Sequence, residues 1–288
     1  MNNNNNNNNK PTKTIENMFI GGIAGVVSRT LTAPIELQKI QKQTNAVLQK
    51  NTLWNTFKTE GITALWKGNM VNCIRIFPHM SINYSVIQLV KTQLENREST
   101  KYMRDTSKMI ISSTLAGISC VVLMNPFEII RTRVSLQSKN NCYNGIYDAV
   151  KKTSIKEMYY GTTVSLFGFV PFNVISFTLY NKFKYCVKDK KDQNLYNMYN
   201  LIFGGISGIT AITVTYPTDL VRRRLHIQGF REATIIYNSS TACVKDIYVK
   251  EGISGFYKGL LSAYAKIFPT MALQFATIDY LNRLSMFQ

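Results

Sequence analysis

A six-residue motif recurs three times along the chain at an almost constant interval. Each copy has a proline first, an acidic residue third and a basic residue sixth, and the three prolines lie 92 and 91 residues apart. A cluster of small residues precedes each copy. Later in each unit there is a glycine that follows an aromatic residue by two positions, and a further proline comes ten residues after that glycine. Offsets matched in three copies indicate three repeated structural units. The motifs are residues 34–39, 126–131 and 217–222, the small-residue clusters are 21–25, 113–117 and 204–208, the landmark glycines are Gly68, Gly161 and Gly259, and the later prolines are Pro78, Pro171 and Pro269.

Two long helices are expected in each repeat. Each exceeds the roughly 20 residues that span a bilayer, and small residues four apart let neighbouring helices approach closely. Polar residues recur on one face of each helix, which suits a bundle around a water-filled cavity. We therefore predict an all-α membrane protein with six transmembrane helices in three pseudosymmetric repeats, each of two long helices and one short helix. The expected long helices are 15–44, 70–95, 106–137, 164–188, 197–228 and 260–285, within repeats 14–100, 101–195 and 196–288, after a disordered asparagine-rich tail, 1–13.

The excess of basic residues indicates an anionic partner. Lysine and arginine number 34 against 16 aspartates and glutamates, a net charge of +18, which leaves nucleic acid, anionic lipid and phosphorylated solutes open. The five cysteines lack metal-ligand spacing and there are two histidines, so we expect neither a metal site nor a disulfide framework. No nucleophile–base pair or phosphate-binding glycine loop is evident, so we expect no enzyme and no cofactor. No presequence precedes Thr14, so any organelle address is expected within the mature chain.

Residue types that all three repeats share are expected to serve a common frame. A proline inside a helix removes a backbone hydrogen bond and kinks the helix, which would draw three helix ends together at one side of the membrane. The acid of each motif can then meet the base of a neighbouring repeat and close a ring of ion pairs. The alternative is that each acid pairs with the base three residues later on its own helix. The ring residues are Glu36, Lys39, Glu128, Arg131, Asp219 and Arg222.

Positions that differ among the repeats are free to recognise an asymmetric solute. Arg75, Gly168 and Lys266 stand seven residues after the landmark glycines, and further side chains follow at helical spacing, so all are expected at one level of the cavity. Arginine and lysine suit phosphate oxygens, which favours a polyanion with a flat or apolar group. The alternatives are a merely electropositive lining and, for the phenylalanines, helix packing. The candidate substrate-binding residues are Arg29, Arg75, His79, Asn83, Gly168, Phe169, Phe172, Lys266, Thr270 and Gln274.

The triplicated motif resembles that of the mitochondrial carrier family (solute carrier 25), over residues 15–285. The resemblance implies a solute exchanger of the inner mitochondrial membrane that alternates between matrix-open and cytoplasm-open states. It assigns the ion-pair ring to a matrix-side gate and the short helices to the matrix side.

A subgroup of that family carries adenine nucleotides, ATP-Mg/phosphate and coenzyme A, and residues 22–30 leading into Pro34 resemble its first repeat. The contact positions at Arg75, Gly168 and Lys266 are similar as well. The triple arginine at 222–224 is similar to a segment of ADP/ATP exchangers, whereas His79 and Asn173 depart from the subgroup.

The resemblance also implies a second, cytoplasmic ring near the ends of the even-numbered helices. This chain has one acid there, Asp279, which could reach Lys91 or Lys184. We therefore expect the unliganded carrier to keep its matrix ring closed and its cytoplasmic side open. The candidate gate residues are Gln88, Lys91, Asn181, Lys184 and Asp279.

The expected partners are a small anionic solute and a membrane lipid, since the corners around the landmark glycines resemble the cardiolipin-binding corners of the family. We expect a monomer and no nucleic acid. Alternative substrates are thiamine diphosphate, phosphate or a keto acid. The alternative from another class is a basic helical-repeat protein that binds nucleic acid, which would cluster its cations on an exposed stripe with aromatic residues.

Overall fold

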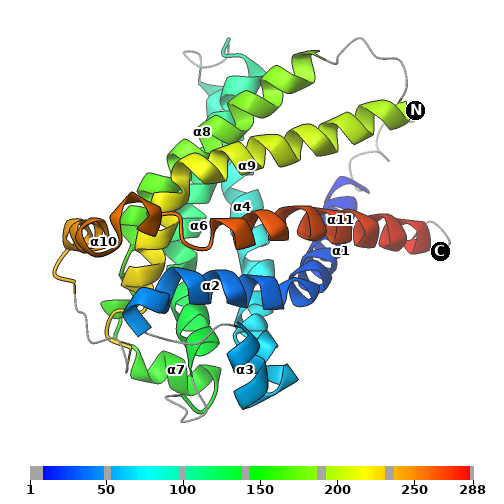
Figure 1. Ribbon diagram of the computed structural model, residues 1–288. Helices are drawn as coiled ribbons and strands as arrows, with labels where there is room; N and C mark the ends of the chain where they lie inside the picture. The colour runs from blue at the N-terminus through cyan, green and yellow to red at the C-terminus, as the bar shows by residue number, and fades with distance from the viewer. Residues whose placement is uncertain are drawn as a thin grey trace, which may run out of the picture.

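Every regular element in the part of the chain that the structure describes is a helix. The computed structural model describes residues 9–48, 53–97, 102–137, 143–186, 193–230 and 237–285 (Figure 1). Each repeat has two long helical segments and one short helix, as predicted. The long segments are α1 (Asn9–Leu31) with α2 (Ala33–Leu48), α4 (Asn69–Asn96), α6 (Asp105–Leu136), α8 (Thr162–Cys186), α9 (Gln193–His226) and α11 (Leu260–Ser285), and the shorter helices are α3 (Leu53–Glu60), α7 (Ile146–Lys152) and α10 (Ser240–Gly255).

The long helices match the prediction to within a few residues, except at the first proline motif. The segment expected as one helix, 15–44, is divided into α1 and α2 at Thr32. Pro34 explains the division, because proline has no N–H to donate to the carbonyl four residues earlier. That carbonyl, of Thr30, instead accepts a hydrogen bond from the indole Nε1 of Trp66 at 2.8 Å.

Part of the tail that was expected to be disordered lies in the first helix. α1 begins at Asn9, so residues 9–13 are helical, while residues 1–8 lie outside the described residues. Pro11 is compatible with this start, because the first N–H groups of a helix have no partner within it.

The long helices form a closed ring in chain order. α4 packs extensively against α6, α8 against α9, and α11 against α1, so each of these seams joins two different repeats. In Figure 1 the last seam is visible, with the red α11 beside the blue α1.

The landmark glycines lie where one repeat meets the next. All three have positive φ, which favours glycine, and a Cβ added at any of them would press on the following repeat. Glycine is therefore required both by the turn and by the neighbour. The groups that such a Cβ would meet are Ser135 at Gly68 (φ 77°), Leu225 at Gly161 (φ 73°), and Tyr216 and the carbonyl of Lys39 at Gly259 (φ 89°).

Within the described part of the chain, two of the long helices are long and apolar enough to be candidate membrane spans. These are α6 and the segment 157–185, which contains α8. In the second, 6% of the apolar window is buried within the protein, whereas the core helix of a soluble protein would be mostly buried. The apolar surface of α8 is therefore available to lipid. The other long helices carry most of the charged side chains of the cavity described below.

Two candidate substrate contacts also pack helices together. A Cβ at Gly168 on α8 would overlap the Oγ1 of Thr218 on α9, so the two helices approach closely there. The ring of Phe169 lies over Gly117 on α6, where a Cβ would overlap it. Helix packing, one of the two interpretations of Phe169, is therefore observed.

We expect Gly168→Ala to destabilise the protein by about 1–3 kcal/mol, because overpacking at a tight contact forces backbone shifts. Gly204→Ala on α9 is the matched control, since a Cβ there meets nothing within 4 Å. Thermal unfolding of the detergent-solubilised protein measures both. Adding Thr218→Ala should recover part of the loss, and equal stability of the Gly168 and Gly204 variants would contradict the packing role.

Candidate functional site

A polar cavity of about 300 Å³ lies inside the helix ring. Five cations and two carboxylates are among its lining residues, so the lining carries a net charge of +3. The lining comes from α1, α2, α4, α6, α9 and α11. An enclosed excess of cations attracts anions. The lining residues are Gly25, Ser28, Arg29, Glu36, Asn72, Arg75, Ile76, Met80, Glu128, Arg131, Arg223, Lys266, Thr270 and Gln274.

Two of the predicted substrate-binding cations are paired with acids of the predicted ring. Nη1 of Arg75 contacts Oε1 of Glu128, and Nζ of Lys266 donates to Oε2 of Glu36 at 2.7 Å. The sequence places these cations and acids in separate groups. In the structure they form one cluster, because the side chains from α4 and α11 reach the level of the motif acids.

Arg29 differs from the other cavity cations. It forms no ion pair within the described residues, and its Nη1 donates to the neutral amide oxygen Oδ1 of Asn72 at 3.1 Å. Thr270 lies in the same lining, and its buried Oγ1 has no hydrogen-bond partner among the described residues. These groups can therefore receive an anion without first losing a carboxylate.

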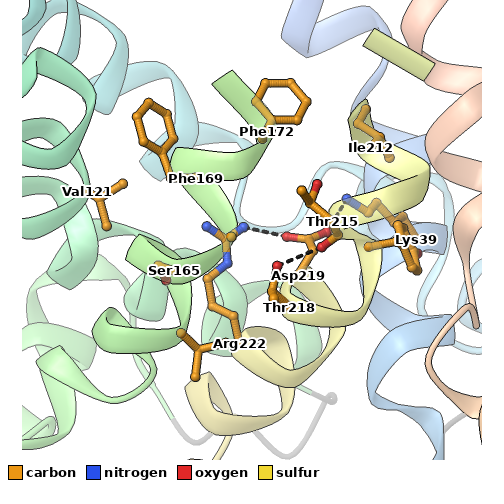
Figure 2. Close-up of a pocket in the computed structure, with 13 residues that line it drawn as sticks. Lys39, Val121, Ser165, Phe169, Phe172, Ile212, Thr215, Thr218, Asp219 and Arg222 are labelled. Atoms are coloured by element: carbon orange, nitrogen blue, oxygen red, sulfur yellow. Dashed lines mark hydrogen bonds and ion pairs between the residues drawn. The ribbon is translucent and has the colours of Figure 1, made fainter. Parts of the chain in front are cut away.

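A second pocket, of about 260 Å³, lies between α8 and α9 and is more apolar (Figure 2). Gly168, Phe169 and Phe172 line this pocket and are not among the lining residues of the polar cavity, so the candidate contacts are divided between two pockets, and their position at one level of a single cavity stays a prediction. The close approach of α8 to α9 at Gly168 places this face of α8 against α9. The lining residues are Lys39, Val121, Val164, Ser165, Gly168, Phe169, Phe172, Ile212, Thr215, Tyr216, Thr218, Asp219 and Arg222.

His79 and Asn83 are not among the lining residues of these two pockets, so their assignment as substrate contacts stays a prediction. On α4 the cavity is lined at Asn72, Arg75, Ile76 and Met80, a row with helical spacing. His79 stands seven residues after Asn72 and four after Arg75, so at 3.6 residues per turn it lies on the same face of α4 as this row.

The predicted ring contains two ion pairs between repeats. Nζ of Lys39 donates to Oδ2 of Asp219 at 2.7 Å, and Nη2 of Arg131 lies 3.1 Å from Oε1 of Glu36. The Nε2 of Gln43 also donates to Oδ2 of Asp219, at 3.1 Å. These pairs join α2 to α9 and α6 to α2.

The third inter-repeat pair is made by Arg223 and not by Arg222. Nη1 of Arg223 donates to Oε2 of Glu128 at 3.1 Å, whereas Nη2 of Arg222 donates to Asp219 on its own helix at 2.7 Å. The intrahelical alternative therefore describes Arg222. Successive residues of a helix differ by about 100°, so Arg223 faces α6 while Arg222 faces α8. The sequence marks residues 222–224 by their three arginines, but the symmetry of the three motifs predicts that the first of them, Arg222, makes the pair between repeats.

The third arginine of that segment connects α9 to the short helix of its repeat. Nη1 of Arg224 lies 2.6 Å from Oε1 of Glu251 on α10, and Lys258 lies 2.7 Å from the other oxygen. Burial alone would raise the pKa of Glu251, but hydrogen bonds from these two cations lower it below its ordinary value. No group of three metal-binding side chains occurs among the described residues.

The five candidate residues of the second ring do not pair with one another. Asp279 lies 3.0 Å from Arg283 and Lys91 lies 3.9 Å from Glu95, each on its own helix. The expected contact of Asp279 with Lys91 or Lys184 is therefore absent, and Asp279 and Lys91 each pair with a residue one helical turn away. Gln88 and Lys184 are exposed, Asn181 is half-buried, and Asp279 is 67% exposed.

Comparison with known proteins agrees with the repeat. A family model for the mitochondrial carrier protein matches residues 10–98, 104–191 and 193–288. Mitochondrial substrate carrier family protein P of Dictyostelium discoideum is 30% identical, over 91% of each chain. The mitochondrial adenine nucleotide transporter ADNT1 of Arabidopsis thaliana is 29% identical, over 92% of this chain and 85% of its own. The human mitochondrial adenyl nucleotide antiporter SLC25A24 is 30% identical over 92% of this chain and 57% of its own. The three matched repeats cover nearly all of the six-helix ring, and the chain belongs to the mitochondrial carrier family, whose members are transporters.

Proposed function

We propose that this carrier exchanges a phosphorylated, adenine-containing anion across the inner mitochondrial membrane by alternating access. The observation that carries the proposal is the polar cavity, with five cations against two carboxylates, beside a pocket with two phenylalanines. The names of the related ADNT1 and SLC25A24 carriers support the same substrate class.

Phosphate oxygens enter at Arg29. Because this guanidinium forms no ion pair among the described residues, it binds an anion at lower cost than Arg75 or Lys266. Those two cations form ion pairs with Glu128 and Glu36. They turn from these acids to the substrate phosphates as the charge of the substrate approaches. A substrate with several phosphate charges can contact all three.

The second pocket suits a purine ring. Phe169, Phe172, Val121 and Ile212 supply apolar surface. The hydroxyl groups of Ser165, Thr215 and Thr218 each donate to a carbonyl of their own helix. Their oxygens are left as acceptors, which suits an amino group such as that of adenine.

Substrate binding and the matrix gate share the same acids. When phosphate draws Arg75 and Lys266 away, Glu128 and Glu36 lose one cation each and the ring is weakened. The other end of the bundle has intrahelical pairs where a second ring would form. We assign the paired end to a closed matrix gate and the unpaired end to an open cytoplasmic side. Cardiolipin binding and a monomeric state stay predictions.

The decisive experiment is uptake by proteoliposomes loaded with unlabelled ADP. Labelled ADP, ATP, AMP, coenzyme A, thiamine diphosphate, phosphate and a keto acid are compared. The proposal predicts exchange of adenine-containing phosphates. Uptake of phosphate or the keto acid without any nucleotide would refute it, and binding of nucleic acid by the purified protein would favour the basic helical-repeat alternative.

Arg29→Gln should raise the half-saturating nucleotide concentration by about tenfold or more. A hydrogen bond to a charged group contributes about 1.5–3 kcal/mol, and 1.4 kcal/mol is a factor of ten. Exchange kinetics in proteoliposomes measure the change. Arg104→Gln, at an exposed arginine before α6, is the charge-matched control. An unchanged half-saturation in the Arg29 variant would remove Arg29 from the site.

Lys39→Glu should impair nucleotide exchange severely, because residue 39 would then repel Asp219. Adding Asp219→Lys should restore part of the exchange, and adding Glu128→Lys should not, since Glu128 is held by Arg75 and Arg223. Rescue by Glu128→Lys with none by Asp219→Lys would reverse the assigned direction of the ring.

Ser176→Cys, in a background without the five native cysteines, tests the orientation. Without substrate, a membrane-impermeant thiol reagent should label this position faster from the cytoplasmic side. Thr241→Cys, exposed on α10, is the control that should label from the matrix side. Faster labelling of residue 176 from the matrix would refute the closed matrix gate.

A further inference from the structure

Arg29 on α1 is held by an amide, whereas the other two phosphate-binding cations of the proposed function are held by carboxylates. Nη1 of Arg29 donates to Oδ1 of Asn72 on α4 at 3.1 Å, while Arg75 and Lys266 each form an ion pair with an acid. Asn72 is 5% exposed and lines the polar cavity together with Arg29. An amide oxygen accepts a hydrogen bond but carries no net charge, so this partner leaves the positive charge of Arg29 uncompensated.

The backbone on both sides of Arg29 is anchored to neighbouring helices. The hydroxyl of Ser28, which is buried, donates to the carbonyl of Thr270 on α11 at 2.8 Å. Nδ2 of Asn69 on α4 donates to Oγ1 of Thr30 at 3.0 Å. The Cα of Arg29 is thus fixed before a ligand arrives, and the freedom that remains is that of its side chain. Fixing that side chain as well lowers the ordering cost of binding.

The arginine and its amide partner occur together in the first repeat. Their equivalents in the other repeats are found five residues before the motif proline and four residues after the landmark glycine. The second and third repeats have an apolar residue at the first of these positions and a serine or an alanine at the second. Because the pair breaks the threefold symmetry at both positions, it fits recognition of a solute better than a common frame. The equivalent positions are Arg29 and Asn72, Val121 and Ser165, and Ile212 and Ala263.

We propose that Asn72 is a positioning residue for substrate binding. It orients the guanidinium of Arg29 toward the substrate phosphates and, as a neutral acceptor, leaves the whole charge of this cation for them. A carboxylate at the same place would form an ion pair with Arg29 and lower the net charge of the cavity lining by one. The amide therefore sets the affinity of the cavity for anions through Arg29. This inference rests on the proposed function, because it assumes that Arg29 binds a phosphate of the transported nucleotide.

Asn72→Asp keeps the shape of the side chain and its acceptor oxygen and adds one negative charge. Gln274→Glu on α11 is the matched control, since it adds the same charge to the same lining. In proteoliposomes that exchange ADP, Asn72→Asp should raise the half-saturating ADP concentration about tenfold more than Gln274→Glu, which corresponds to about 1.4 kcal/mol. The maximal rate should change much less, because the lost contact serves binding.

The same two variants in an Arg29→Gln background separate positioning from a general effect of charge. Residues that act through one another are not additive, so with Arg29 removed the excess of Asn72→Asp over Gln274→Glu should vanish. An excess that persists without Arg29, or equal effects of the two variants in the unaltered chain, would refute the role of Asn72 while nucleotide exchange stands. If the unaltered chain exchanges no adenine nucleotide, the proposed function fails, and this inference fails with it.

A second pair of variants guards against misfolding of a chain with a new buried carboxylate. If Asn72→Asp does not fold, Asn72→Leu replaces it and is compared with Gln274→Leu by the same criterion, since leucine removes the acceptor without adding a charge. If either variant folds but no longer transports, ADP-induced shifts in thermal unfolding of the detergent-solubilised protein supply the comparison without turnover.

Discussion

Two buried carboxylates, Glu36 on α2 and Glu128 on α6, connect the helix ring at its centre. Glu36 lies near cations of α6, α9 and α11, and Glu128 near cations of α4, α6 and α9. Removing one partner from a buried pair leaves an uncompensated charge and costs about 3–5 kcal/mol, so these acids keep five long helical segments in register. The cations around them line the polar cavity. Under the proposed function, binding and gating therefore use one charge cluster.

The architecture was predictable because it depends on features that repeat. Matched offsets around Pro34, Pro126 and Pro217 predicted the long helices, and polar faces predicted a cavity inside the bundle. Pro34 also predicts a kink, and the helix does divide beside it. These inferences need only the period of a helix and the covalent chemistry of proline, and both are local.

The arrangement inside the site was less predictable, because spacing gives an angle around a helix and not the reach of a side chain. Arg222 and Arg223 are adjacent, and which of them meets Glu128 depends on how α9 is rotated against α6. His79 shares the cavity-lining face of α4 by its spacing and yet is not among the residues that line the polar cavity. The second pocket is lined by both Gly168 and Thr218, which come from different repeats and approach each other closely. Such contacts are properties of the assembled ring.

The closed ring also sets the order in which the protein can be completed. The seams of α4 with α6 and of α8 with α9 join segments that are close in sequence, but the seam of α1 with α11 joins the two ends of the chain. Forming contacts at such long sequence separation is slow, because a long loop must close first. α1 therefore lacks its most extensive contact until α11 has been synthesised. The close approach of Gly259 to the carbonyl of Lys39 also forms only at that stage. Until then Arg29 and Glu36 lack the wall that α11 provides, and a carrier shortened at its C-terminus would have its most polar face open to the bilayer.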